Sequence, residues 1–161
     1  LMRQYLQQVT NTTTPLPTAR WSTSSAHIAP QVSQLWSAGW FQNLNQNIFE
    51  LSAEVYYRAT ANILDYRPGA NFLLQPYPET QLLPGRSRAY GVELMVAKKK
   101  GELTGWVNYT FARTENQVNA GPNFDQRING DNWYRANFDR PHSFNASINI
   151  NQTRHHSFSF N

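Results

Sequence analysis

Hydrophobic and polar residues alternate with a period of two along most of the chain. The alternation is clearest over 143–151, where the apolar positions are Phe144, Ala146, Ile148 and Ile150 and the positions between them are serine or asparagine. Such a pattern predicts β-strands with one apolar face and one polar face. Helical periodicity covers no comparable span. The sequence therefore predicts an all-β protein.

Turn signals divide the chain into about seven strands. We expect these at roughly 1–10, 30–43, 47–60, 87–99, 103–116, 142–151 and 155–161. Short links at 43–47, 99–102 and 152–154 alternate with long links at 11–29, 61–86 and 117–141. Every second connection is thus a tight hairpin, and all the long loops are expected at one end of the strands.

This alternation of loop lengths distinguishes two classes of β protein. Long structureless connections are uncommon in compact soluble domains. Outer-membrane β-barrels, in contrast, combine short periplasmic turns with long extracellular loops, and their strands present apolar residues to lipid and polar residues to the lumen. Strands can cross hydrocarbon only where every backbone edge is paired in a closed ring. The sequence predicts an antiparallel transmembrane β-barrel segment.

The barrel prediction assigns residues to faces. The lipid-facing residues are expected to be Leu51, Val55, Val92, Leu94, Phe144, Ile148 and Ile150, and the lumen-facing residues Glu50, Glu54 and Glu93. Aromatic residues near strand ends, such as Trp40 and Tyr57, are typical of the girdles at the two membrane interfaces. Aromatic residues also decorate the strands of ordinary β-sandwiches, so a soluble β-rich protein remains an alternative.

Composition narrows the function classes. The charged fraction of 15% is low for a soluble domain, and polarity comes largely from 17 asparagines and 12 glutamines. The net charge is +4, but the basic residues form no stripe, which argues against a nucleic-acid partner. The absence of cysteine excludes disulfides and thiolate chemistry. No apolar run approaches the length of a transmembrane helix, and the N-terminal residues indicate an interior piece of a longer protein.

Residues suited to catalysis or metal binding form no convincing set. The paired glutamates on the 47–60 strand are better explained by a hydrated lumen than by acid–base chemistry. His155 and His156 are adjacent on a strand and point to opposite faces, so they do not readily share a metal ion with His142. No nucleophile elbow or phosphate loop occurs. We expect no enzyme activity, no metal and no cofactor.

The long loops hold the better candidates for function. They carry aromatic residues among prolines and amides, and we expect Tyr66, Phe72, Tyr77, Trp133 and Tyr134 to contribute to ligand binding. Aromatic faces beside amide donors suit sugars, peptides or a partner lipoprotein. Loops on a rigid scaffold are where binding residues concentrate. Packing of the loops against each other is the alternative for any one of these side chains.

Several motifs occur in a fixed order along the chain. Residues 88–94 read Arg-Ala-Tyr-Gly-Val-Glu-Leu, a lysine-rich turn follows, 105–111 read Gly-Trp-Val-Asn-Tyr-Thr-Phe, and 139–142 read Asp-Arg-Pro-His before the last long strand. These motifs resemble the barrels of TonB-dependent outer-membrane receptors, particularly the nutrient receptors of Bacteroidetes, and Tyr56-Tyr57-Arg58 and the 128–134 segment also resemble that family. The order and spacing of the motifs extend over most of the chain.

The resemblance implies part of the C-terminal half of a 22-stranded barrel, with 1–161 lacking a plug domain. It implies a location in the bacterial outer membrane and import of a nutrient such as an oligosaccharide, a peptide or a chelate. The implied partners are outer-membrane lipid, the rest of the barrel and its plug, the TonB complex and a surface lipoprotein. Two alternatives stay open: a secreted glycan-binding or adhesin module, and a small structural barrel of eight strands.

Overall fold

The structure is a computed structural model that describes residues 2–9, 20–25, 27–70, 78–118, 127–153 and 156–160. Within these ranges the regular elements are β-strands and two short 3-10 turns, η1 (Pro78–Gln81) and η3 (Asn129–Asp131). The prediction of an all-β protein is confirmed. None of the helical segments among the described residues has the length or apolarity needed to cross a membrane.

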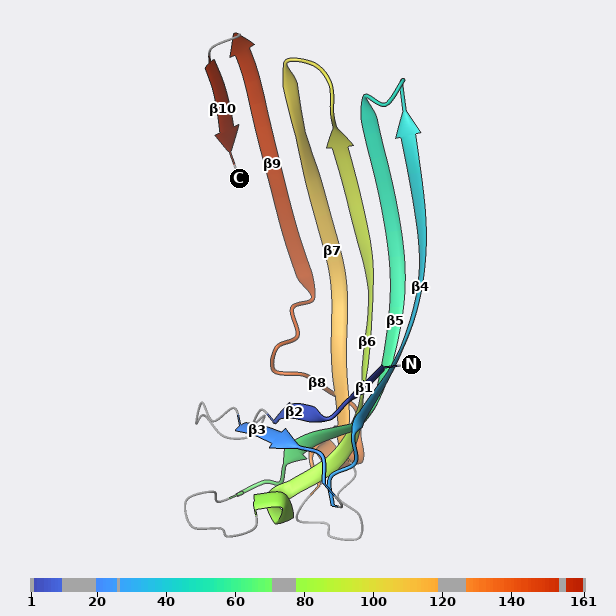
Figure 1. The fold of residues 1–161 in the computed structure, drawn as a ribbon, viewed down its shortest axis with the longest axis vertical. Helices are drawn as coiled ribbons and strands as arrows, with labels where there is room; N and C mark the ends of the chain where they lie inside the picture. The colour runs from blue at the N-terminus through green and yellow to red at the C-terminus, as the bar shows by residue number, and fades with distance from the viewer. Residues whose placement is uncertain are drawn as a thin grey trace. The chain divides into compact units, whose positions relative to one another are not determined.

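Antiparallel pairing joins most strands into one sheet (Figure 1). Its order is β1-β4-β5-β6-β7-β9-β10, with β8 beside β7, while β2 and β3 form a separate pair. The strand bounds are β1 Met2–Gln4, β2 Leu6–Val9, β3 Arg20–Thr23, β4 Gln31–Leu44, β5 Phe49–Tyr66, β6 Leu82–Lys98, β7 Leu103–Val118, β8 Tyr134–Arg135, β9 His142–Thr153 and β10 His156–Phe160. Among the described residues no pairing joins β1 to β10, so the order is open at both ends.

The chain divides into two compact units. Unit 1 holds 1–35, 58–89 and 114–139, and unit 2 holds 36–57, 90–113 and 140–161. Strands β4 to β7 each supply residues to both units. Unit 1 contains the long connections, and unit 2 contains the tight turns that link β4 to β5 and β6 to β7.

Unit 1 has a small apolar core. Leu83, Val118 and Ile128 form a buried cluster, and Tyr134 packs against it. Val118 is fully enclosed, with no exposed surface. Leu83 and Val118 belong to β6 and β7, whereas Ile128 and Tyr134 belong to the segment that links β7 to β9. The cluster therefore holds this linking segment against the sheet.

Unit 2 buries very little. Among its described residues whose exposure is given, only Gly91, Ala97 and Ser147 are buried. The register between β7 and β9 pairs Tyr109 with Phe144 and Val107 with Ala146, whereas Thr110 faces Ser143 and Asn108 faces Asn145. On one face apolar residues therefore oppose apolar residues, and on the other polar residues oppose polar residues, as the alternating sequence requires, except that Trp106 lies opposite Ser147 on the polar face.

The tight turn between β4 and β5 depends on asparagine. Asn45, Gln46 and Asn47 all have positive φ, with values of 51°, 53° and 65°. Asparagine tolerates this left-handed conformation better than most residues because its side chain hydrogen-bonds locally. Ile48 N donates to the Leu44 carbonyl at 3.1 Å and closes the turn. The abundant asparagine of the sequence is thus partly accounted for by turn geometry.

Several strand boundaries differ from the sequence prediction. The expected strand at 1–10 is interrupted at Tyr5, and its two parts, β1 and β2, pair with different strands. The expected loop at 61–86 is partly strand, since β5 continues to Tyr66 and β6 begins at Leu82. A positive φ of 60° at Asn62 breaks the period of two, and its side chain is bonded to the Pro30 carbonyl at 2.9 Å. The alternation therefore ends before the strand does.

Gly105 allows β7 and β9 to approach closely. A Cβ on Gly105 would lie 2.2 Å from the Ser147 carbonyl oxygen, and the residue has a φ of 158°. We expect Gly105→Ala to separate the two strands locally and to lower the free energy of unfolding by about 1–3 kcal/mol. Thermal unfolding of the full chain, followed by circular dichroism, measures this.

Gly39→Ala is the matched control for that variant. A Cβ on Gly39 would meet its nearest atom, the Ala53 carbonyl oxygen, at 3.7 Å, an ordinary contact. We expect the midpoint of unfolding to stay close to that of the native chain. Equal losses from both alanines would contradict the proposed importance of the close approach at Gly105.

Candidate functional site

The described part of unit 1 contains three of the five aromatic residues expected to bind ligand. Tyr66 ends β5 and is only 3% exposed, while Trp133 and Tyr134 follow η3 and are half-buried. Phe72 and Tyr77 lie outside the described residues. The structure thus brings Tyr66, Trp133 and Tyr134 into one unit, and their part in ligand binding stays a prediction.

Asp65 connects the end of β5 to the long connection before β9. Its carboxylate is 2% exposed and accepts a hydrogen bond from the Tyr134 hydroxyl, with 2.6 Å between Oη and Oδ2. The other oxygen, Oδ1, accepts the backbone N–H of Tyr66 at 2.8 Å. A buried carboxylate is tolerable only with such donors. Nothing in the sequence indicates this contact, because the partner Tyr134 is 69 positions away.

The position of the Trp133 side chain is set by a second polar group, which consists of Arg86, Arg88 and Glu115. Arg88 forms an ion pair with Glu115, with 2.7 Å between Nη2 and Oε2, and its Nε donates to the same oxygen at 2.7 Å. The Arg88 guanidinium lies 4.2 Å from the centre of the Trp133 ring, and that of Arg86 lies 5.4 Å from it. Both are within the range of cation–π attraction. Trp133 is therefore held over two arginines of β6.

A hollow of about 320 Å³ lies beside this group. Its lining includes Asn62, Arg86, Gln117 and Asp131, with Ala61, Pro84 and Gly85 completing it. Its volume falls within the range of small-molecule sites. Only glycine fits at position 85, because a Cβ there would lie 2.6 Å from the Gln117 carbonyl oxygen. We take this hollow as the candidate functional site.

The side chains of the hollow are positioned by one another. Arg86 Nε donates to Gln117 Oε1 at 2.8 Å, and Gln117 Nε2 donates to the Asp131 carbonyl at 2.6 Å. Asp131 Oδ2 pairs with Arg127 Nε at 3.1 Å, and among the described residues its Oδ1 is buried without a hydrogen-bond partner. The site thus combines an exposed guanidinium with a carboxylate and amides, which suits a polar ligand that both donates and accepts hydrogen bonds.

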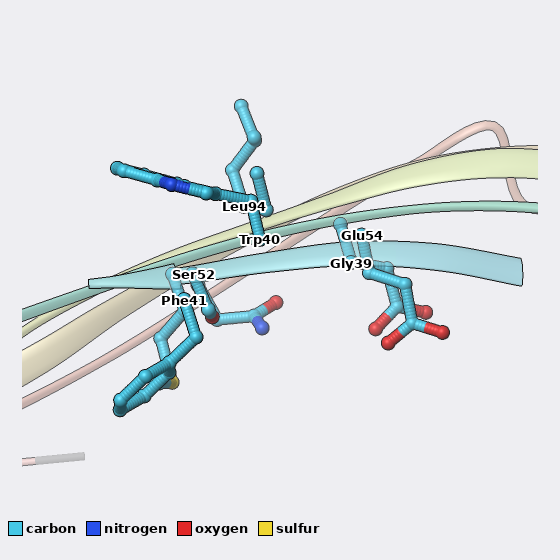
Figure 2. A pocket seen from close by; sticks show the side chains of 10 residues that line it. Gly39, Trp40, Phe41, Ser52, Glu54 and Leu94 are labelled. Atoms are coloured by element: carbon cyan, nitrogen blue, oxygen red, sulfur yellow. The ribbon is translucent and has the colours of Figure 1, made fainter.

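The residues expected on the lipid and lumen faces lie in unit 2. Phe144, Val55, Leu94, Ile148, Ile150 and Val92 are 67%, 50%, 45%, 45%, 39% and 37% exposed, and Leu51 is half-buried. Figure 2 shows Trp40 and Leu94 on one side of the sheet and Glu54 and Phe41 on the other. The exposed apolar residues and the glutamate therefore project to opposite faces, with Phe41 as an aromatic exception on the polar side.

The three glutamates have different surroundings. Glu50 pairs with Lys99, whereas Glu54 and Glu93 line a second hollow of about 320 Å³ together with Asn108 (Figure 2). Among the described residues no group of three or more histidine or acidic side chains is placed to hold a metal ion. His142 instead contacts aromatic residues, with its Nδ1 2.8 Å from the Tyr109 hydroxyl.

Tyr134→Phe tests the link between Asp65 and the connection before β9. The variant keeps the ring in the apolar cluster but removes the donor to a buried carboxylate. We expect a loss of about 1–3 kcal/mol in the free energy of unfolding, measured by denaturant titration of the full chain. Tyr109→Phe is the control, because it removes a hydroxyl from an exposed residue and is expected to cost little. A Tyr134 variant as stable as the control would contradict the role given to Asp65.

Comparisons with known proteins give no relative for this site or for the fold. No protein-family model, no curated protein and no solved structure matches the chain.

Proposed function

We propose that this chain is part of the barrel of a TonB-dependent outer-membrane receptor that binds a nutrient and imports it. The observation that carries the proposal is the exposed apolar face of unit 2. A contiguous exposed apolar surface on a soluble monomer rarely exceeds several hundred square ångströms. Here exposed apolar side chains recur at every second position along neighbouring strands, including Val92, Leu94 and Val96 of β6. Contact with lipid accounts for such a face.

Aromatic residues border this face in the manner of an interfacial girdle. Trp36 and Tyr57 have ring centroids 6.0 Å apart, and Tyr109 is hydrogen-bonded to His142. From Phe49 to Tyr57 the strand rises by about 27 Å, taking about 3.4 Å for each residue. With a tilt of about 40°, the corresponding height is about 21 Å, near the ~25 Å apolar band of outer-membrane barrels.

The distribution of buried residues favours a single-layered barrel wall and argues against a soluble β-sandwich. Two packed sheets bury one face of each sheet, so that large apolar side chains meet between them. In unit 2 the buried residues with given exposure are a glycine, an alanine and a serine. A glycan-binding sandwich predicts buried leucines, isoleucines and aromatic residues at these strands.

Unit 1 supplies the binding element of the proposal. It contains the long connections, and its hollow presents Arg86, Gln117 and Asp131 linked by hydrogen bonds, with Asn62 held by its own bond to the Pro30 carbonyl. Preorganised polar groups of this kind recognise polar solutes at a lower entropic cost than mobile side chains do. Transport itself requires the plug and the TonB complex that the resemblance implies.

Membrane fractionation of the parent protein tests the proposal. We expect the protein in the outer-membrane fraction, released only by detergent, with an unboiled form that migrates differently from the boiled form on a denaturing gel. A closed, hydrogen-bonded barrel resists unfolding by detergent until it is heated. Recovery of the protein in the soluble fraction without detergent would overturn the proposal.

A further inference from the structure

The apolar face of unit 2 contains a groove that ends in a lysine. Val96 and Lys98 of β6, Leu103, Gly105 and Val107 of β7, and Ile148 of β9 line a volume of about 190 Å³. This exceeds the roughly 150 Å³ of an engineered apolar cavity that admits benzene. Thr104, Trp106 and Ser147 complete the lining, and apart from Lys98 at its end the exposed surface of the groove is almost entirely apolar.

Gly105 creates the groove. In the apolar row of β7, Leu103 and Val107 flank a residue without a side chain, opposite Ile148 of β9. A Cβ at Gly105 would collide with the Ser147 carbonyl oxygen, so the depression follows from the pairing of the two strands. The neighbouring side chains Val96, Leu103, Val107 and Ile148 are 48%, 48%, 41% and 45% exposed and form its walls.

Lys98 places a charge at the end of the groove. Lys98 continues the apolar row of Val92, Leu94 and Val96. Its side chain ends beside Gly101 in the turn, where Nζ would lie 3.7 Å from a Cβ added to that glycine. Lys99 pairs with Glu50, and Lys100 donates to the Gln46 carbonyl at 2.8 Å. Within the described residues Lys98 has no ion pair or hydrogen bond. A lysine that extends along an apolar surface keeps its ammonium at the polar boundary.

We propose that this groove binds one acyl chain of an anionic glycerophospholipid, with the lipid phosphate on Lys98. The proposal rests on the membrane location proposed above. Hydrocarbon matches the apolar walls, and a phosphate complements the ammonium that the turn leaves without a partner. Short turns of outer-membrane barrels lie on the periplasmic side, which places the lipid in that leaflet.

Native mass spectrometry of the parent protein that contains this chain tests the choice of headgroup. The protein in detergent is incubated with equal amounts of phosphatidylglycerol and phosphatidylethanolamine, and the retained lipid is counted. We expect about fivefold more phosphatidylglycerol on the native chain, the preference that one lysine near a membrane surface provides. Lys98→Gln is expected to reduce this ratio to about one. Lys100→Gln is the matched control and is expected to keep the ratio.

A second variant tests the groove itself. Val96→Trp fills the groove and is expected to lower the retention of both lipids, whereas Leu94→Trp, on the same row but outside the groove, is expected to leave it unchanged. Circular dichroism verifies that each variant is folded. A preference that survives Lys98→Gln, or a retained mass equal to a second copy of the chain, would overturn the lipid site. A chain that stays soluble without detergent would instead overturn the proposed function.

Discussion

Leu94→Lys is expected to cost the protein about 2–4 kcal/mol of stability in the membrane, the largest effect that a single substitution in unit 2 should produce. Leu94 is 45% exposed on the face that carries Trp40 (Figure 2), midway along the apolar row of β6. In the proposed barrel this position lies against hydrocarbon, where an ammonium loses its hydration. Denaturant titration of the protein folded into lipid vesicles measures the loss.

The same substitution has the opposite consequence in a soluble protein. Replacing an exposed leucine there changes stability by less than about 0.5 kcal/mol and improves solubility. The sign and size of the Leu94→Lys effect therefore separate the two interpretations of the exposed face.

Asn108→Lys provides the matched control for Leu94→Lys. Asn108 opposes Asn145 on the polar face and lines the hollow that contains Glu54 and Glu93. A new lysine there meets water and carboxylates, so we expect folding into vesicles to proceed as in the native chain. Equal losses from Leu94→Lys and Asn108→Lys would contradict the assignment of lipid to one face alone.

Arg88→Met is expected to destabilise unit 1 by about 2 kcal/mol. The variant keeps the length of the side chain but removes the ion pair with Glu115, whose side chain is only 10% exposed. Breaking a fully buried ion pair by removing one partner costs about 3–5 kcal/mol. We expect less here because the Arg88 side chain is 34% exposed and water screens part of the interaction. The guanidinium nearest to the Trp133 ring is lost as well.

Hydrogen exchange localises the effect of Arg88→Met. We expect faster exchange of the Ala136 backbone N–H, which is bonded to the Thr114 carbonyl at 3.0 Å, because the segment after Trp133 loses its anchor. Arg86→Met is the control. Arg86 is exposed, bonds the amide of Gln117 and lies farther from the ring, so its loss is expected to cost under about 1 kcal/mol. Equal destabilisation by the two variants would contradict the role of the Glu115 carboxylate.

The sequence predicted the strands that follow an unbroken alternation. The segments expected at 103–116 and 142–151 are β7 and β9, and their register places most residues opposite residues of like polarity. It failed where local geometry interrupts the alternation. The positive φ at Asn62 hides the continuation of β5, and β8 is too short, at two residues, to show any period. A pattern of period two is visible only where the backbone keeps that period.

The candidate site was predictable only in part. Aromatic content drew attention to the segments of Tyr66, Trp133 and Tyr134, but the groups that position them are Asp65, Arg88 and Glu115. Each of these contacts joins residues at least 27 positions apart. Charged residues in polar segments give no local signal of such pairing. The hollow beside Arg86 likewise comes from four segments that no sequence pattern connects.

The sequence by itself determined that this protein is built from antiparallel β-strands with one apolar and one polar face, because side chains of a strand alternate strictly and the residues alternate with them. It also determined the tight turns, where asparagine and glycine accept positive φ. Only the tertiary structure decided the order of the strands, the Asp65–Tyr134 and Arg88–Glu115 contacts, the groove at Gly105 and the exposure of the apolar face. These depend on the approach of distant segments, which hydrogen-bond register and side-chain packing fix together and which no single segment encodes.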